Sequence, residues 1–313
     1  MSDASHSLDE RPTRPPPPVI APPGLVRRVA QWFRQPGVLN ALPVLVLFVT
    51  GFGAPLIIVM EFSFLPSRTF GYHGTWTLEN FERIFSETFY ISYLWSFGMA
   101  ALTVAILLVV CYPAAYGMAK LFGKWSIIVT FLFLMPMFVS ENVRLFGWFL
   151  FHLPRSGVLA GIIREVFGAE DIGTLLYTPT SIIFGLVYVY LPFVLFPMTL
   201  GIAMIPKDLV ESARDLGASR FQIFREIEIP IAMPGILVGG LLSFVLAVGA
   251  ISESKVLGGM SVITIANEIQ HEFTYAQNWP MGSALATIMI GVVAVIVTFV
   301  MGRLDLDALL GRK

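Results

Sequence analysis

Among the charged and aromatic side chains inside, or at the ends of, the long apolar runs of this sequence, six are candidates for contact with a substrate. They are Glu141, Arg144, Trp148, Tyr188, Tyr190 and Glu253. A charged group costs free energy in a hydrocarbon environment, so residues of this kind usually serve a function. Carboxylates attract a cation, and the faces of tyrosine and tryptophan rings do the same. These residue types therefore predict contact with a positively charged substrate.

Simpler explanations exist for the charged members of this set. Glu141 and Arg144 lie three residues apart and would meet on one helix face, where they can pair with each other. Glu253 and Lys255 lie two residues apart and would face different sides, which leaves Glu253 for another partner. Another simple explanation is that these charges anchor helix ends at the outer surface of the membrane.

Other kinds of chemistry find little support in the sequence. The four histidines have no i, i+4 spacing that would suit a metal ion, and the single cysteine, Cys111, excludes an internal disulfide. No Gly-x-x-x-x-Gly-Lys-[Ser/Thr] loop is present for a nucleotide phosphate. No convergent set of His, Asp, Glu, Ser or Cys residues indicates a membrane enzyme. We therefore expect no catalytic residue, no metal site and no cofactor in this chain.

A second group of polar residues interrupts the apolar chain between Glu211 and Pro230, with the sequence ESARDLGASRFQIFREIEIP. Asp208 and Glu211 have the spacing of a capping box, which predicts a helix over 209–216. Gly217 suits the left-handed conformation that ends a helix. Ser219 and Gln222 form a second capping box, and we expect Pro230 to stop the second helix.

Both predicted helices carry an apolar stripe. Leu209, Ala213 and Leu216 form the first stripe, and Phe221, Phe224 and Ile227 form the second. Apolar faces on a short hairpin need a surface to cover them. The stretch therefore predicts a docking element.

The elements that position these residues are membrane-spanning helices. The chain has 313 residues, of which 56% are hydrophobic and 13% are charged, whereas a soluble domain carries about 25% charged residues. A helix needs about 20 apolar residues to cross the hydrocarbon core. Six runs meet this length, at 38–64, 90–117, 125–151, 179–204, 234–257 and 281–301. We predict an all-α membrane protein with six transmembrane helices.

Positive charges predict the orientation of these spans. Of the 20 Lys and Arg residues, 14 fall on the side of the N-terminus, and 6 fall on the other: Arg68, Arg83, Arg144, Arg155, Arg164 and Lys255. Because positive residues favour the cytoplasmic side, both termini and the polar hairpin are predicted to be cytoplasmic. The net charge of −1 gives no support for nucleic-acid binding.

The domain organisation follows from these segments. Residues 1–35 form a proline-rich tail that we expect to be disordered, and we expect deletion of residues 1–18 to leave transport intact. Residues 36–303 form the six-helix domain, which includes the hairpin at 206–232, and residues 304–313 form a C-terminal tail. Short helices are predicted on the outer surface, at 158–167 and within 261–279.

The hairpin resembles a known family motif. Glu211-Ser212-Ala213, followed by Gly217 and by Ile229-Pro230, is similar to the EAA loop of bacterial ABC-importer permeases, with Ser212 in place of the first alanine. Other motifs resemble the spermidine/putrescine-type branch of that family. They are Met233-Pro234-Gly235-Ile236, Leu176-Tyr177-Thr178-Pro179, Gly185-Leu186-Val187-Tyr188, Val143-Arg144, Gly147-Trp148, Leu257-Gly258-Gly259 and Trp279-Pro280. The resemblance covers residues 42–302.

The resemblance implies a type I (MetI-like) ABC importer permease fold in the bacterial inner membrane. It implies a heterodimer with a second permease, two copies of a cytoplasmic ATPase that binds the ATP, and a periplasmic solute-binding protein. The residues that would contact the ATPase are Glu211, Ser212, Ala213, Asp215, Leu216, Gly217, Phe221 and Pro230. The substrate implied is a polyamine or a similar small organic cation.

Two alternatives stay open on the sequence. The first keeps the importer class and changes the cargo to an amino-acid derivative, a phosphonate or a metal ion. The second is a secondary transporter, which would also have six spans but would not need the hairpin at Glu211 to Pro230.

Overall fold

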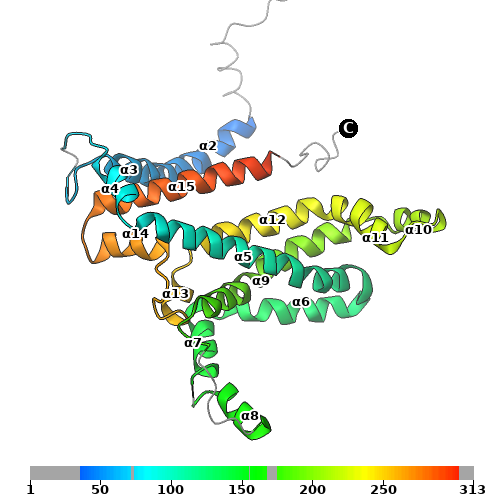
Figure 1. Cartoon of the computed structure of the whole chain (residues 1–313). Coiled ribbons are helices and arrows are strands. Elements are labelled where there is room, and N and C mark those ends of the chain that lie inside the picture. The colour runs from blue at the N-terminus through cyan, green and yellow to red at the C-terminus, as the bar shows by residue number, and fades with distance from the viewer. Residues whose placement is uncertain (1–35, 72–73, 155, 168–174, 303–313) are drawn as a thin grey trace, which may run out of the picture. The chain divides into compact units, whose positions relative to one another are not determined.

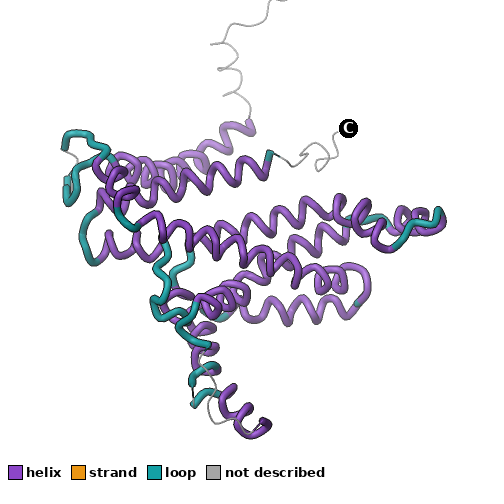
Figure 2. The backbone as a smooth tube through the Cα atoms, viewed as in Figure 1, coloured by secondary structure: helices purple, strands orange, loops and turns teal. Residues whose placement is uncertain are grey.

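The computed structural model describes residues 36–71, 74–154, 156–167 and 175–302, and the regular elements in these ranges are all helices (Figures 1 and 2). Helices satisfy their own backbone hydrogen bonds, which a chain inside a bilayer requires. The predicted tails, 1–35 and 304–313, lie outside the described residues. The chain divides into two units, residues 1–57 and 58–313, and each is described by itself.

The first predicted span is helical throughout. It consists of α2 (Pro36–Phe48), a π-helical turn (Val49–Gly53) and α3 (Ala54–Ser63). The 23 residues Ala41–Ser63 are long and apolar enough to cross a membrane. The prediction for 38–64 is confirmed.

Three further spans also agree with the prediction to within a few residues. They are α5 (Phe89–Tyr116) with its π-helical extension to Leu121, α9 (Pro179–Ala203) and α15 (Trp279–Met301). Pro113, Pro192 and Pro197 lie inside α5 and α9 without ending them. In total, the described residues contain five helices that could cross a membrane, or six if one bent pair counts as a span.

The bent pair replaces the single span predicted for 125–151. Residues Gly123–Phe138, which include α6 (Ser126–Leu134), meet α7 (Glu141–Phe151) at an angle of 97°. Pro136 lies in a 3-10 turn just before the break, and Val139 is extended. Proline removes a backbone donor and favours such a break. The bend makes Glu141 the first residue of a new helix.

The fifth span begins earlier than predicted. α11 (Arg220–Ile223), a π-helical turn (Phe224–Glu228) and α12 (Ile229–Val248) form one continuous helix of 29 residues. The prediction that Pro230 stops the second hairpin helix is therefore wrong. Pro230 occupies the first turn of α12, where proline is tolerated, directly after a π turn in which the Ile229 amide donates to the Phe224 carbonyl oxygen.

The C-terminal part of the run predicted at 234–257 is a separate element. The helix ends at Val248, and a short helix, α13 (Ser252–Val256), follows after an interruption at 249–251. Glu253 consequently lies in α13, outside the continuous spans.

Helix α9 packs against α5 and α12 at the centre of the second unit. A Cβ atom on Gly235 would lie 2.3 Å from the Pro197 carbonyl oxygen and 2.9 Å from the Gly201 Cα. Gly239 meets the Val194 backbone in the same way, since a Cβ there would lie 3.0 Å from the Val194 carbonyl oxygen. Small residues at such contacts let the two helix backbones approach closely, and the approach adds van der Waals contact between them.

The short helices α4 (Glu79–Ser86), α8 (Val158–Phe167) and α14 (Ile265–Thr274) connect the spans, and α8 and α14 confirm that those two segments are helical. Two distant sequence motifs meet beside α13. The Tyr177 amide and the Ser181 hydroxyl both donate to the Leu257 carbonyl oxygen, at 2.8 and 3.0 Å. Gly259 leaves space for the Tyr177 ring, which would lie 2.2 Å from a Cβ there.

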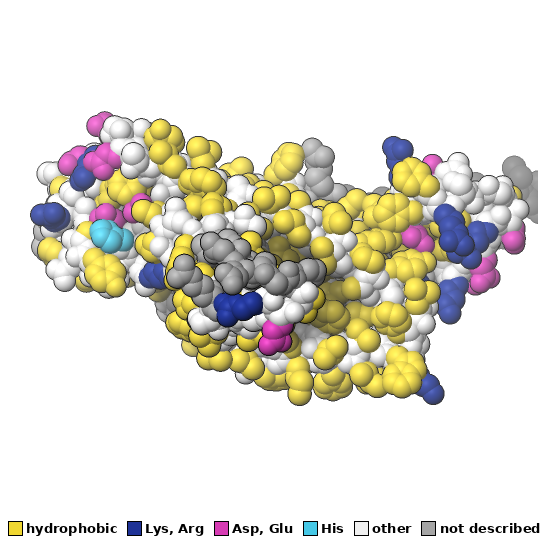
Figure 3. Space-filling view, turned by 60° about the horizontal axis from the view of Figure 1, so that its bottom comes forward, with side chains coloured by type: hydrophobic (Ala, Val, Ile, Leu, Met, Phe, Trp, Pro, Cys, Tyr) yellow, Lys and Arg dark blue, Asp and Glu magenta, His cyan; other side chains and the backbone are white. Residues whose placement is uncertain are grey.

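The surface has the character of a membrane protein. Hydrophobic side chains cover much of the face in Figure 3, and most of the Lys and Arg side chains lie towards its two ends. Within the second unit, the α10–α11 hairpin lies at one end of α9 and α12, and α13 and α14 lie at the other (Figure 1).

Candidate functional site

The polar stretch folds as a helical hairpin. Helix α10 (Lys207–Asp215) begins two residues before the predicted start, and Asp208 lies in its first turn, so the Asp208–Glu211 capping box is not formed. Gly217 has φ +82°, which confirms the left-handed cap. Ser219 and Gln222 form the predicted capping box, since each backbone amide donates to the other side chain at 2.8 and 3.2 Å.

The tip of the hairpin exposes apolar side chains. Leu216 is 89% exposed and Phe221 is 67% exposed. Glu211, Ser212, Asp215 and Gly217 are exposed beside them, and Ala213 is half-buried. Pro230 is exposed, but it lies in α12 and not at the tip. Seven of the eight predicted coupling residues therefore share one small projecting element.

A buried carboxylate connects the hairpin to the spans. Glu228 is 8% exposed and accepts hydrogen bonds from the hydroxyls of Tyr112 (3.2 Å) and Tyr116 (3.3 Å) on α5. Nearby, Lys120 donates to the Ile205 carbonyl oxygen at 2.6 Å. Sequence reasoning missed this contact, although two tyrosines four residues apart in an apolar run were a usable signal.

The predicted substrate-path residues come together from three helices. Glu141, Arg144 and Trp148 lie on α7, Tyr188 and Tyr190 lie on α9, and Glu253 lies on α13. Gly185 on α9 allows this approach, because a Cβ there would lie 2.7 Å from the Leu257 side chain and 3.3 Å from Glu253 Cγ. We call these six residues the carboxylate cluster.

Glu253 is the most buried member of the carboxylate cluster. Its side chain has 0% exposure, and neither carboxylate oxygen has a hydrogen-bond partner. Burial, together with the Glu141 charge, raises the pKa of Glu253 to about 7. The Tyr190 hydroxyl lies near enough to oppose this shift in pKa, but it does not form a well-aligned hydrogen bond.

Arg144 does not pair with Glu141 in the described part of the chain. Its Nε and Nη1 atoms are buried without a hydrogen-bond partner. The guanidinium carbon lies 5.7 Å from the centre of the Tyr188 ring, and Trp148 packs edge-on against the same ring at 5.4 Å. Lys255 bonds to Gln270, so it faces away from Glu253, as its spacing predicts.

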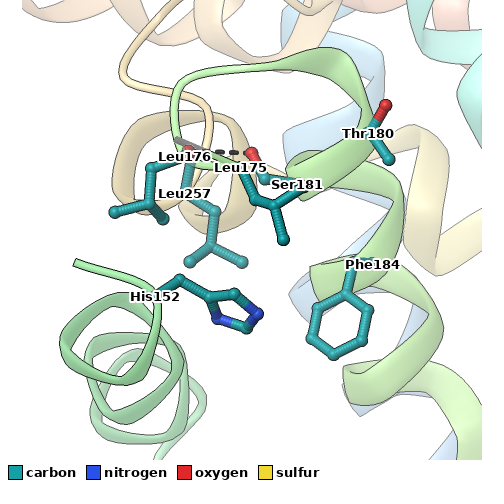
Figure 4. Close-up of a pocket in the computed structure, with 7 residues that line it drawn as sticks. All are labelled: His152, Leu175, Leu176, Thr180, Ser181, Phe184 and Leu257. Carbon is teal, nitrogen blue, oxygen red and sulfur yellow. Dashed lines mark hydrogen bonds between the residues drawn. The ribbon is translucent and has the colours of Figure 1, made fainter. Parts of the chain in front are cut away.

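A cavity of about 170 Å³ lies one helical turn from Trp148, Tyr188 and Glu253 of the carboxylate cluster (Figure 4). His152 follows Trp148 by four residues, Leu257 follows Glu253 by four, and Phe184 precedes Tyr188 by four. Figure 4 shows the His152 ring pointing towards Phe184. The cavity is largely apolar, and Trp148 contacts Phe184 at 4.8 Å between ring centres.

This fold is shared with a chain of a solved ABC transporter. The solved bacterial alginate ABC transporter, in complex with its alginate pentasaccharide-bound periplasmic protein, contains a similar chain with a TM-score of 0.67. The alignment covers 88% of this chain and 97% of that one, at 19% identity.

Sequence comparison gives the family. Residues 112–307 match the family described as "Binding-protein-dependent transport system inner membrane component". The chain is 33% identical to the spermidine/putrescine transport system permease protein PotB of Haemophilus influenzae, over 83% of this chain and 90% of that protein. It is also 33% identical to the PotC permease protein of Escherichia coli K12, over 35% of this chain and 41% of that protein. The chain belongs to the family of binding-protein-dependent transport system inner membrane components.

This membership makes the chain a permease subunit of an ABC importer and not an enzyme. It is a multi-pass protein of the bacterial inner membrane.

Proposed function

We propose that this permease imports a polyamine, such as spermidine or putrescine, or a similar small organic cation. The observation that carries the proposal is the 33% identity to a spermidine/putrescine permease over 83% of the chain. The carboxylate cluster supports it, because two carboxylates and several aromatic rings suit a cation in transit.

The proposal includes partners. The chain would pair with a second, related permease, and its similarity to both PotB and PotC is in keeping with a heterodimer of homologous subunits. Two copies of a cytoplasmic ATPase would bind ATP and Mg²⁺, and a periplasmic binding protein would deliver the substrate. This chain itself would hold no cofactor.

The hairpin would couple the ATPase to the spans. Leu216 and Phe221 are exposed apolar side chains on a rigid, capped element, which suits a groove on a partner. The Tyr112–Glu228 and Tyr116–Glu228 hydrogen bonds would transmit movement of the hairpin to α5.

Uptake of radiolabelled spermidine, in cells that lack other polyamine importers, tests the cargo. We expect ATP-dependent uptake when the chain is expressed with its partner subunits and binding protein. Competition with unlabelled putrescine, an amino-acid derivative or a phosphonate ranks the alternatives. Uptake of one of those solutes, without uptake of any polyamine, would refute the polyamine proposal and keep the importer class.

The coupling role is tested by changes at the hairpin. Glu211→Lys and Gly217→Asp should abolish uptake while membrane insertion stays normal, since each alters the surface presented to the ATPase. Gly217→Asp also places a side chain at φ +82°, which costs about 1 kcal/mol. Glu226→Lys, an exposed charge reversal away from the tip, is the matched control and should retain uptake. Wild-type uptake in both tip variants would contradict the coupling role.

A further inference from the structure

A completely buried carboxylate needs a proton, hydrogen-bond donors or a cation. Glu228 has such donors, because two tyrosine hydroxyls bond to its oxygens. Glu253 is more deeply buried, and both of its oxygens lack a partner. Its bonding capacity is therefore left for a proton or for a cation that the chain itself does not supply.

A second carboxylate and an unpaired guanidinium accompany Glu253. The half-buried Glu141 adds negative charge from α7. Arg144 carries the nearest positive charge on that helix, yet its buried Nε and Nη1 atoms bond to neither carboxylate. The guanidinium instead faces the Tyr188 ring at 5.7 Å. Arginine usually pairs with a carboxylate when one is in reach, so this arrangement leaves the two carboxylates open.

The adjoining cavity indicates which kind of cation would fit. It lies about 5 Å along α13 from Glu253, the distance of one helical turn, whereas Glu141 lies at the other end of α7 from His152. Its lining includes Phe184, Leu257 and the His152 ring. An inorganic cation would gain little from this apolar space, whereas a methylene chain attached to an ammonium group would fill it.

We propose that Glu253, Glu141 and Tyr190 bind one ammonium group of an aliphatic amine, that the neighbouring cavity takes its methylene chain, and that Arg144 competes with the ammonium group for the carboxylates. The inference rests on the proposed function, since the amine would be the substrate in transit. This competition would keep binding of the amine weak enough for the substrate to leave the site.

The test is binding to the assembled membrane complex without its periplasmic binding protein. The complex is purified in lipid nanodiscs, and its thermal unfolding is followed by tryptophan fluorescence during titration with putrescine. 1,4-Butanediol has the same four-carbon chain without charge and is the control ligand. We expect putrescine to raise the unfolding midpoint in a saturable manner and butanediol to have no effect.

Three variants locate the effect. Glu253→Gln should raise the half-saturating putrescine concentration by about tenfold or more, because it removes the charged acceptor. Glu141→Gln, at a half-buried position that tolerates change more easily, should weaken binding in the same direction. Arg144→Gln should lower the half-saturating concentration by about tenfold, because it removes a like charge beside the ammonium group. Glu268→Gln on α14 changes a carboxylate outside the site and should match the wild type.

Two results would overturn the inference. The first is that putrescine gives no saturable shift in the unfolding midpoint of the wild-type complex, although cells that carry this complex import spermidine. The second is that the wild type and both carboxylate variants show equal shifts in the unfolding midpoint. The inference and the proposed function fail separately. If uptake of polyamines is absent and a putrescine shift still depends on Glu253, the cargo is wrong and the ammonium site stands.

Discussion

Glu228 and Glu253 are both buried carboxylates, but their surroundings differ. Glu228 is satisfied by two tyrosine hydroxyls, and it connects the hairpin to α5. Neither oxygen of Glu253 has a hydrogen-bond partner, although Glu141 and Arg144 on α7 and Tyr190 on α9 lie near it. The hydrogen bonds hold the Glu228 side chain against α5, whereas the Glu253 carboxylate has no group paired with it.

This unpaired carboxylate predicts a pH dependence of stability. The pKa of Glu253 is raised from 4.5 to about 7 in the folded protein. Between these pH values the folded state keeps the proton and the unfolded state has lost it, so stability falls as pH rises through this window. Glu253→Gln should remove the decline and make the protein more stable above pH 7, by roughly 3 kcal/mol. Thermal unfolding midpoints of the ligand-free complex between pH 5 and pH 8 measure this.

Ser252→Ala is the control for this measurement, since it changes the same short helix without altering a titrating group. It should keep the wild-type decline. A wild-type slope in Glu253→Gln would show that another group causes the pH dependence.

At the scale of elements, the helix interruptions position the candidate site. The 97° bend between α6 and α7 brings Glu141, Arg144 and Trp148 to α9. The separation of α13 from α12 turns Glu253 towards the same place.

Close packing of α9 and α12 holds these elements, and it gives a prediction. Gly235→Ala should destabilise the protein by about 1–3 kcal/mol, because a Cβ would lie 2.3 Å from the Pro197 carbonyl oxygen. Gly291→Ala on α15 is the control, with no neighbour within 4 Å of the added carbon. Unfolding midpoints of the two variants test this, and an equal effect in both would contradict the packing argument.

At the scale of the whole molecule, the predicted orientation remains to be tested. Cys111 is the one cysteine and is buried, so Cys111→Ser gives a background for labelling. Leu216→Cys at the hairpin tip and Phe85→Cys on α4 both introduce accessible thiols, since those residues are 89% and 70% exposed.

A membrane-impermeant maleimide should label Phe85→Cys in intact spheroplasts and Leu216→Cys only in inside-out vesicles. This outcome follows from the 14 to 6 distribution of positive residues. Labelling of Leu216→Cys from outside would reverse the orientation and remove the hairpin from the reach of a cytoplasmic ATPase.

Much of the fold could be predicted from the sequence. Four of the six apolar runs match helices that could span a membrane, because long hydrophobic runs have few other stable conformations in lipid. The Gly217 turn and the Ser219 capping box were also predictable, since they depend on local backbone chemistry. The family resemblance of the hairpin came from a short contiguous motif.

The tertiary structure decided the remainder. The proline rule gave the wrong result at Pro230, because a π turn and its position in the first turn of α12 allow the helix to continue. The meeting of Glu141, Arg144, Tyr188 and Glu253 depends on Gly185 and on two helix breaks, which are contacts between segments far apart in the chain. Sequence spacing fixes which residues share a helix face, whereas packing fixes which faces meet. That is why the sequence determined the spans and the hairpin turn, and only the folded chain showed that Glu253 is buried without a partner.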